Sequence, residues 1–254
     1  MKLTILGSGT AGPHPRRASP AHWLETSKGT VLLDCSIDAP HRMAEEQLDW
    51  PNLDAIWISH FHLDHIGGLT PFLWGTKWAP QTRNRTKPLR IYGPAGLRRL
   101  VDAVNDSNNY RLFEQPFPIE IVEVEPDEDW HLLPGISATT LSTPHTKESL
   151  ALRLKDEDSK LFVYTSDTGF SENLALFAKD AALLLMECSF RRNKTVQKHL
   201  ELADAMRVAQ DCQPGKLVLT HLYGEWDGVD LSAEARQSWV GETIEAKDGL
   251  VLEI

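Results

Sequence analysis

A dense group of metal-binding residue types follows one short apolar run and constrains the fold more than any other feature. The segment ISHFHLDHIGG covers residues 58–68 and places three of the ten histidines, with one aspartate, within six positions. These residues are His60, His62, Asp64 and His65. Imidazole and carboxylate groups are usual ligands of zinc, manganese and iron. The segment therefore predicts a metal site just after a buried strand at residues 55–59.

Four side chains cannot complete two metal sites, so we expect further ligands at the ends of other strands. Three polar residues each follow an apolar run in the same way. They are His145 after ATTLSTP, Asp167 after LFVYTS and His221 after KLVLT. A turn role would account for Asp167 alone, because aspartate is common in turns. As three repeats of one arrangement, these residues favour ligands gathered at one rigid sheet edge.

The spacing of the apolar runs predicts an α/β fold with two mixed sheets. Strands are expected at residues 3–6, 22–25, 30–33, 55–59, 89–92, 119–125, 138–142, 150–154, 161–165, 182–187, 217–220 and 250–254. Helices are expected at residues 94–106, 172–180 and 201–212. Early strands follow one another directly and helices come later, so we expect two sheets covered by helices. Asp248-Gly249 predicts a hairpin with a type I′ turn.

Composition limits the class of protein. The chain has 254 residues and a formal net charge of −10, so it lacks the overall basic charge that non-specific nucleic-acid binding requires. No apolar run reaches the roughly 18 residues of a membrane span. The cysteines, Cys35, Cys188 and Cys212, form no CxxC pair, which is typical of a reducing compartment. We expect one domain over residues 1–254, in the cytoplasm and without a membrane partner.

The sequence resembles the metallo-β-lactamase superfamily, and within it the ribonuclease Z-like branch. The similar segments are LTILGSGTAGPHPRRAS (3–19), VLLDCS (31–36), ISHFHLDHIGGL (58–69), LRIYGPAGLRRLV (89–101), STPH (142–145), YTSDTG (164–169), KHLELADAM (198–206) and LVLTHL (217–222). They span nearly the whole chain in family order. HxHxDH is specific for the superfamily, whereas IYGPAGL and His199 point to the branch.

The resemblance implies a four-layer αβ/βα sandwich with two metals at one edge. The implied ligands of one metal are His60, His62 and His145. Those of the other metal are Asp64, His65 and His221, with Asp167 bridging the two. The implied cofactors are two divalent ions, zinc first, with manganese and iron as alternatives.

This arrangement predicts a metal-dependent hydrolase whose catalytic residues are Asp64, His199 and Glu187. Two metals about 3.5–4 Å apart can share a hydroxide near neutral pH, and this nucleophile attacks phosphorus or a carbonyl carbon. The resemblance implies that His199 lies over the site as general acid and that Glu187 orients it. An imidazole suits this role because it carries and releases a proton near pH 7.

Two departures from the family argue against transfer RNA as a substrate. Ribonuclease Z enzymes that mature transfer RNA carry a long arm between the third and fourth metal motifs. Here Asp167 follows His145 by only 22 positions, so the chain resembles a short form without that arm. The segment after the last histidine, LYGEWDG, carries Glu225 and Asp227, which would repel a polyanion. We therefore expect a small phosphodiester or a short nucleotide as substrate.

Other functions remain open from the sequence. A lactonase or thioesterase could use the same site, and a metal-free binding or regulatory protein could keep the same fold. An iron-containing redox protein is a third alternative. A homodimer is also left open. So are the roles of four arginines, Arg16 and Arg17 in the first loop and Arg191 and Arg192 in a basic cluster that also includes Lys194 and Lys198.

Overall fold

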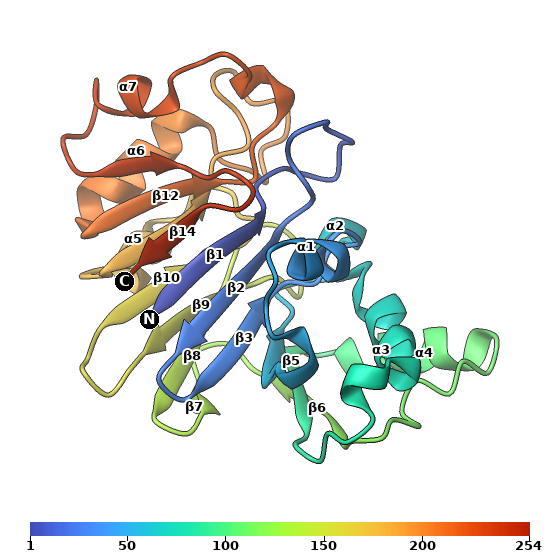
Figure 1. Cartoon of the computed structure of the whole chain (residues 1–254). Coiled ribbons are helices and arrows are strands. Elements are labelled where there is room, and N and C mark those ends of the chain that lie inside the picture. The colour runs from blue at the N-terminus through green and yellow to red at the C-terminus, as the bar shows by residue number, and fades with distance from the viewer.

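Two mixed β-sheets of seven strands each pack face to face in the computed structural model, which describes residues 1–254 (Figure 1). The first sheet contains, in spatial order, β14 (Val251–Glu253), β1 (Lys2–Gly7), β2 (Ala21–Thr26), β3 (Gly29–Leu33), β4 (Ala55–Trp57), β5 (Leu89–Pro94) and β6 (Ile119–Val124). The second contains β13 (Thr243–Glu245), β12 (Lys216–Thr220), β11 (Leu183–Glu187), β10 (Leu161–Tyr164), β9 (Leu150–Lys155), β8 (Ile136–Ser142) and β7 (Asp129–Leu133).

Each sheet is antiparallel at one side and parallel at the other. Strands β14, β1, β2 and β3 pair antiparallel, and β3 to β6 pair parallel. Likewise β7 to β10 pair antiparallel, and β10 to β13 pair parallel. Parallel neighbours end at the same edge of a sheet, so the residues that follow β4, β10, β11 and β12 are brought to common edges.

Helices cover the outer face of each sheet. The helices on the first sheet are α1 (Ala39–Glu45), α2 (Leu63–Ile66), α3 (Leu69–Trp78) and α4 (Leu97–Ser107). Those on the second are α5 (Glu172–Phe177), α6 (Leu202–Cys212) and α7 (Leu231–Ala235). Single 3-10 turns lie at Trp50–Asn52, Pro80–Thr82 and Gly224–Trp226.

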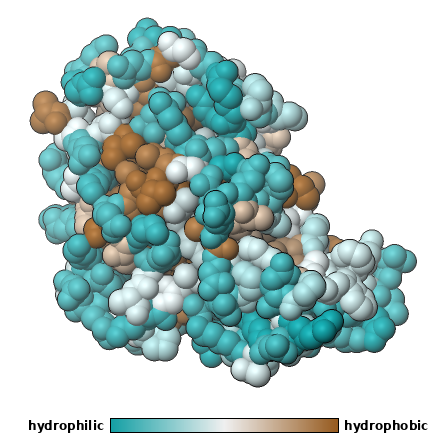
Figure 2. All heavy atoms as spheres, viewed as in Figure 1, coloured by the Kyte–Doolittle hydropathy of each residue, from teal (hydrophilic) through white to brown (hydrophobic).

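The alternation of side chains along each strand builds three apolar layers. In β3, Val31 and Leu33 pack between the two sheets, whereas Leu32 packs outward beneath the helices. This is the period-two pattern of a strand that is buried on both faces. Hydrophilic side chains cover most of the visible face, with separate apolar patches between them (Figure 2). The expected four-layer αβ/βα sandwich of two mixed sheets is confirmed.

Several boundaries differ from the sequence prediction. The helix expected at residues 94–106 begins at Leu97, because Pro94 completes β5 and Gly96 then adopts a left-handed conformation with φ 101°. Strand β7 was not expected, nor were α1, α2, α3 and α7, and β13 was implied only as one arm of a hairpin. All of these elements except α3, which has 10 residues, are short, so their apolar periodicity is weak. No helix has both the length and the apolar character needed to cross a membrane.

The hairpin predicted at Asp248-Gly249 is wrong. The strands on either side belong to different sheets, since β13 pairs with β12 and β14 pairs with β1. A type I′ turn needs positive φ at both central residues, but here only Gly249 has it, with φ 82°. Asp248 instead accepts hydrogen bonds from the Ser8 and Ala18 amides, at 2.9 and 2.7 Å. Asp248 thereby fixes the loop after β1. This loop also contacts the segment after β12, because the Leu222 amide donates a hydrogen bond to the Ser8 carbonyl.

Candidate metal centre and active site

All seven predicted ligands come together at one edge of the sandwich. Four segments deliver them, each directly after a strand, and α2 carries two. They are His60 and His62 after β4, Asp64 and His65 on α2, His145 after β8, Asp167 after β10 and His221 after β12. Residues up to 161 positions apart therefore meet, as the sequence pattern predicted. Their role as ligands remains a prediction.

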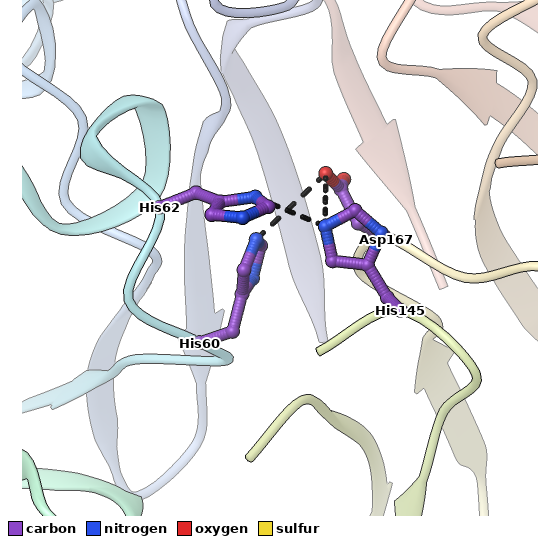
Figure 3. Close-up of side chains that lie close together, drawn as sticks. All are labelled: His60, His62, His145 and Asp167. Atoms are coloured by element: carbon purple, nitrogen blue, oxygen red, sulfur yellow. Dashed lines mark hydrogen bonds and ion pairs between the residues drawn. The ribbon is translucent and has the colours of Figure 1, made fainter. Parts of the chain in front are cut away.

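The first group of donor atoms consists of His60, His62, His145 and Asp167 (Figure 3). His62 Nδ1 and His145 Nε2 are 3.0 Å apart. Asp167 Oδ2 lies 3.8 Å from His60 Nε2 and 3.5 Å from His145 Nε2. His62 is exposed and the other three are buried, so this group opens to solvent on the His62 side.

The second group consists of Asp64, His65 and His221, again with Asp167. Asp64 Oδ2 lies 3.6 Å from His65 Nε2 and 3.5 Å from His221 Nε2. The second oxygen of Asp167, Oδ1, lies 3.3 Å from both imidazole nitrogens. Asp167 thus turns one carboxylate oxygen toward each group of donors.

The donor atoms fit metal ions better than they fit each other. In a tetrahedral site with zinc–nitrogen distances of about 2.0–2.1 Å, neighbouring ligand atoms lie about 3.3 Å apart, close to the separations found here. Four buried donor atoms have no hydrogen-bond partner: His60 Nε2, His65 Nε2, His221 Nε2 and Asp167 Oδ1. Buried polar atoms are normally paired, so four unpaired atoms aimed at one region fit coordination of cations.

Hydrogen bonds on the far ring nitrogens set the histidine tautomers. His65 Nδ1 donates to Asp34 Oδ2 at 2.7 Å, and His145 Nδ1 donates to the Lys198 carbonyl at 2.9 Å. Ser189 Oγ donates to Glu187 Oε2 and so accepts from His221 Nδ1 at 2.8 Å. With Nδ1 protonated, Nε2 of each ring carries the lone pair that a metal needs.

Charge around Asp167 keeps this carboxylate ionised. Burial raises the pKa of Asp167, but the charges of His221 and His65 outweigh burial and hold the pKa well below its usual value. Burial likewise lowers the pKa of His65, yet the carboxylates of Asp167 and Asp34 raise it well above the usual value. The raised pKa of His65 thus reflects the buried negative charge around it, a charge that would also attract cations.

His199 and Glu187 form a pair beside the two groups. His199 Nδ1 lies 2.9 Å from Glu187 Oε1 and 4.0 Å from Asp167 Oδ2. Glu187 ends β11 and also accepts from the Thr168 and Leu200 amides, at 2.7 and 3.1 Å, so its carboxylate is fixed. Burial lowers the pKa of His199, but the hydrogen bond and charge of Glu187 raise it above the usual value overall. Asp167, His199 and His221 also lie close enough to form a third group of ligands.

Comparison with known proteins agrees with this geometry. The model of the family described as Anti-Pycsar protein Apyc1 matches residues 1–240. The chain belongs to this family. It is 28% identical over 257 residues to the probable metallo-hydrolase YhfI of Bacillus subtilis, with 100% of both chains covered. It is also 28% identical over 242 residues to a ribonuclease Z of Ignicoccus hospitalis, covering 78% of each.

Solved structures show the same fold for the Apyc1-family chain. The crystal structure of the metallo-β-lactamase fold protein YhfI from Bacillus subtilis has a TM-score of 0.83 at 26% identity, with 99% of both chains covered. Human tRNase Z, short form, has a TM-score of 0.81 at 22% identity, covering 100% of this chain and 99% of the other. The superfamily and the ribonuclease Z-like branch are thus confirmed, and the protein is a metal-dependent hydrolase.

The sequence did not lead us to Asp34, which orients His65 of the second group through a hydrogen bond. Asp34 directly follows β3 and is fully buried. Its Oδ2 accepts from His65 Nδ1 and Tyr164 Oη, both at 2.7 Å, and its Oδ1 accepts from the Ser59 amide at 2.7 Å. VLLDCS shows the same pattern of an apolar run that ends in a polar residue, and this signal could have identified Asp34.

Replacing Asp34 with Asn should weaken metal binding without removing a ligand. The Asn side chain would turn an N–H donor toward groups that are themselves donors, namely His65, Tyr164 and Ser59. The His65 ring would then lose the hydrogen bond that orients it. We expect a fall of roughly 10–100-fold in metal affinity, measured by chelator competition. Asp54→Asn is the control, because Asp54 is also buried but precedes β4, away from the site. Equal metal affinity in the wild type and Asp34→Asn would contradict this role.

Three of the eleven non-glycine residues with positive φ lie at the same edge. Asp34, Ser166 and His221 each follow a strand and have positive φ angles of 57°, 52° and 58°. Such conformations cost about 1–3 kcal/mol each and persist where surrounding contacts impose them. In the Apyc1-family chain they turn side chains sharply toward the site as each strand ends.

The basic cluster before His199 is mostly neutralised by ion pairs. Arg191 and Arg192 both pair with Glu234, and Lys194 pairs with Asp204 at 2.5 Å. Of this cluster, Lys198 alone forms no ion pair. Acidic residues of α6 and α7 thus bind three of the four cations of this cluster.

Asp227, in the acidic segment after β12, is neutralised in the same way. Asp227 binds His14 at 2.9 Å, Arg16 at 3.1 Å and Arg17 at 2.5 Å, all from the loop after β1. The side-chain hydrogen bonds of His14 and Arg17 lower the pKa of Asp227 to about 2. The repulsion of a polyanion that we expect from Asp227 is thus largely cancelled by Arg16 and Arg17, whereas Glu225 forms no ion pair.

Proposed function

We propose that this protein is a binuclear metal-dependent phosphodiesterase, with residues 1–254 acting as one hydrolase domain. The observation that carries the proposal is the position of Asp167, whose two oxygens face two separate groups of donors. A carboxylate in this position suits a bridge between two ions. We propose zinc as the resident metal, with manganese or iron as alternatives, because the donors are imidazole and carboxylate.

Two divalent ions held here would activate a water molecule as the nucleophile and neutralise charge that develops on the substrate oxygens. The chain itself would fix the ligand geometry through Asp34, Ser189 and the Lys198 carbonyl. It would also supply a proton through His199. Since Glu187 occupies Nδ1 of His199, the other nitrogen, Nε2, is the one that would protonate the leaving alkoxide.

A phosphodiester is favoured over a thioester by this proton donor, because a thiolate leaves without a proton, and over a lactone by the similarity to a ribonuclease Z. An alkoxide that leaves phosphorus needs a proton, and the hydrogen bond and charge of Glu187 raise the pKa of His199, which favours its protonated form. The substrate would be small, because β9 and β10 form a short hairpin where an RNA-gripping arm would emerge. The three free, buried cysteines support a reducing compartment such as the cytoplasm.

Protein purified without chelators should contain close to two divalent metal ions per chain. The physical reason is the two groups of donors that share Asp167. Elemental analysis by plasma mass spectrometry measures the content directly. A sample that contains no metal and binds neither added zinc nor added manganese would contradict the binuclear proposal and leave a metal-free binding protein as the alternative.

A substrate panel tests the reaction class. The metal-loaded protein should hydrolyse bis(p-nitrophenyl) phosphate, and a chelator should abolish the activity. A lactone and a thioester assayed under the same conditions are the comparison. Turnover of either of these, without turnover of the phosphodiester, would replace the proposal by a carbonyl-directed hydrolase on the same site.

A further inference from the structure

A buried serine, Ser59, connects the two groups of donors through hydrogen bonds. It follows β4, directly precedes His60 and is fully buried. Its amide donates to Asp34 Oδ1 at 2.7 Å, and its hydroxyl donates to Asp34 Oδ2 at 2.8 Å. The same hydroxyl oxygen lies 3.0 Å from His60 Nδ1. Ser59 thus lies between a predicted ligand of the first group and the carboxylate that accepts from His65 of the second.

The single proton of the Ser59 hydroxyl fixes the direction of these hydrogen bonds. An ionised carboxylate only accepts, so this proton points to Asp34. Ser166 Oγ donates to Ser59 Oγ at 2.6 Å, and the remaining lone pair of Ser59 accepts from His60 Nδ1. His60 is therefore protonated at Nδ1, and its Nε2 carries the lone pair. This Nε2 is buried, has no hydrogen-bond partner and lies 3.8 Å from Asp167 Oδ2, where a metal ligand is expected.

Asp34 is the shared acceptor of this network. Besides the Ser59 hydroxyl, its Oδ2 accepts from His65 Nδ1 and from Tyr164 Oη, both at 2.7 Å. With the Ser59 amide, four hydrogen bonds therefore converge on one fully buried carboxylate. Hydrogen bonds on the far nitrogen of a ligating imidazole hold the ring orientation and the tautomer that metal binding needs. Asp34 thus orients His65 directly and His60 through Ser59.

We propose that Ser59 is a positioning residue for the ion of the first group, and that Asp34 supports both ions through these two routes. Without the Ser59 hydroxyl, the Nδ1 proton of His60 is buried without an acceptor, an arrangement that costs free energy. The proton then moves to Nε2, or the ring turns, and either change removes the lone pair from the metal position. His65 keeps its hydrogen bond to Asp34. This inference rests on the proposed binuclear centre and adds the residue that orients one of its ligands.

Stepwise removal of metal by a chelator tests the proposal. The metal that remains on the protein is measured by plasma mass spectrometry at each chelator concentration. In Ser59→Ala we expect the affinity for one ion to fall roughly 10–100-fold, while the other ion is released as in the wild type. In Asp34→Asn we expect both ions to be released at a lower chelator concentration. Equal weakening of both ions in Ser59→Ala, or no change in either, would overturn the proposal.

Two matched variants separate this role from a general effect on the fold. Ser59→Thr keeps the hydroxyl and should restore the release profile of the wild type. Ser36→Ala makes the same change at another fully buried serine, whose hydroxyl donates to the Ser19 carbonyl and contacts no predicted ligand. This variant should bind both ions as the wild type does. The melting temperature of each metal-free variant shows that it is folded. Early loss of one ion in Ser36→Ala or in Ser59→Thr would contradict a specific role of the Ser59 hydroxyl.

The tautomer of His60 tests the network in the wild type without any metal. Nitrogen-15 NMR of the metal-free protein should show His60 protonated at Nδ1, with its signal identified by its absence in His60→Gln. In Ser59→Ala the proton should be found at Nε2 in at least part of the population. A proton at Nε2 in the wild type would overturn the role of Ser59. If the wild type binds no metal, the binuclear proposal fails, and the tautomer alone then decides whether Ser59 orients His60.

Discussion

Asp64→Ala is expected to reduce hydrolysis below detection and to lower the metal content of the protein. Asp64 is the one carboxylate that belongs to the second group alone, at 3.6 and 3.5 Å from the imidazole nitrogens of His65 and His221. Burial raises the pKa of Asp64, but the hydrogen bond of His221 and the charge of His65 lower it overall. The side chain is therefore an anion, and its loss removes both a ligand and a charge that balances a divalent ion.

Two further variants are measured beside Asp64→Ala. Asp64→Asn keeps an oxygen donor without the charge, so we expect metal content and activity between those of the wild type and Asp64→Ala. Asp211→Ala, an exposed aspartate on α6, is the control and should behave as wild type. Metal analysis and hydrolysis of bis(p-nitrophenyl) phosphate are the measurements. Full activity in Asp64→Ala would contradict the place of Asp64 among the ligands.

His199→Ala is expected to lower kcat by about 10²–10⁴-fold while the metal content stays unchanged. His199 lies outside the two groups that share Asp167, and its Nδ1 binds Glu187 at 2.9 Å. A general acid matters most when the leaving group is a poor one. The loss should therefore be large for an alkyl phosphodiester and much smaller for a nitrophenyl ester, because nitrophenolate leaves with little protonation.

The result for His199→Ala also decides whether His199 is a general acid or a metal ligand, because the geometry allows both roles. Asp167, His199 and His221 are close enough to share an ion, so loss of metal in His199→Ala would make His199 a ligand. No loss of rate, even with an alkyl leaving group, would make it a bystander and weaken the phosphodiesterase proposal. His131→Ala is the matched control, since His131 is exposed on β7 at the far edge of the second sheet.

Local patterns in the sequence were enough to identify most residues of the candidate site. HxHxDH is compact, and His145, Asp167 and His221 each follow an apolar run, so their residue types and places could be read without a structure. Asp34 has the same pattern but was not identified. Its partner His65 is 31 positions away, and a lone aspartate after a strand more often belongs to a turn.

Strand pairing limited what could be predicted of the fold. The two mixed sheets followed from the order of apolar runs and helices. Asp248-Gly249 looked like a hairpin, yet β13 and β14 join different sheets, because β14 completes the first sheet beside β1 at the other end of the chain. Short strands such as β13, with three residues, carry too little periodicity to be recognised alone.

The sequence by itself determined the fold class, the set of candidate ligands and their order along the chain, because apolar periodicity and residue type are local properties. The tertiary structure decided how the donors divide, with one oxygen of Asp167 facing each group. It also decided which charges remain free, since Asp227 is bound by Arg17 from 210 positions away and Arg191 by Glu234. Ion pairs depend on distance in space, and that distance is fixed only when the two sheets have packed together.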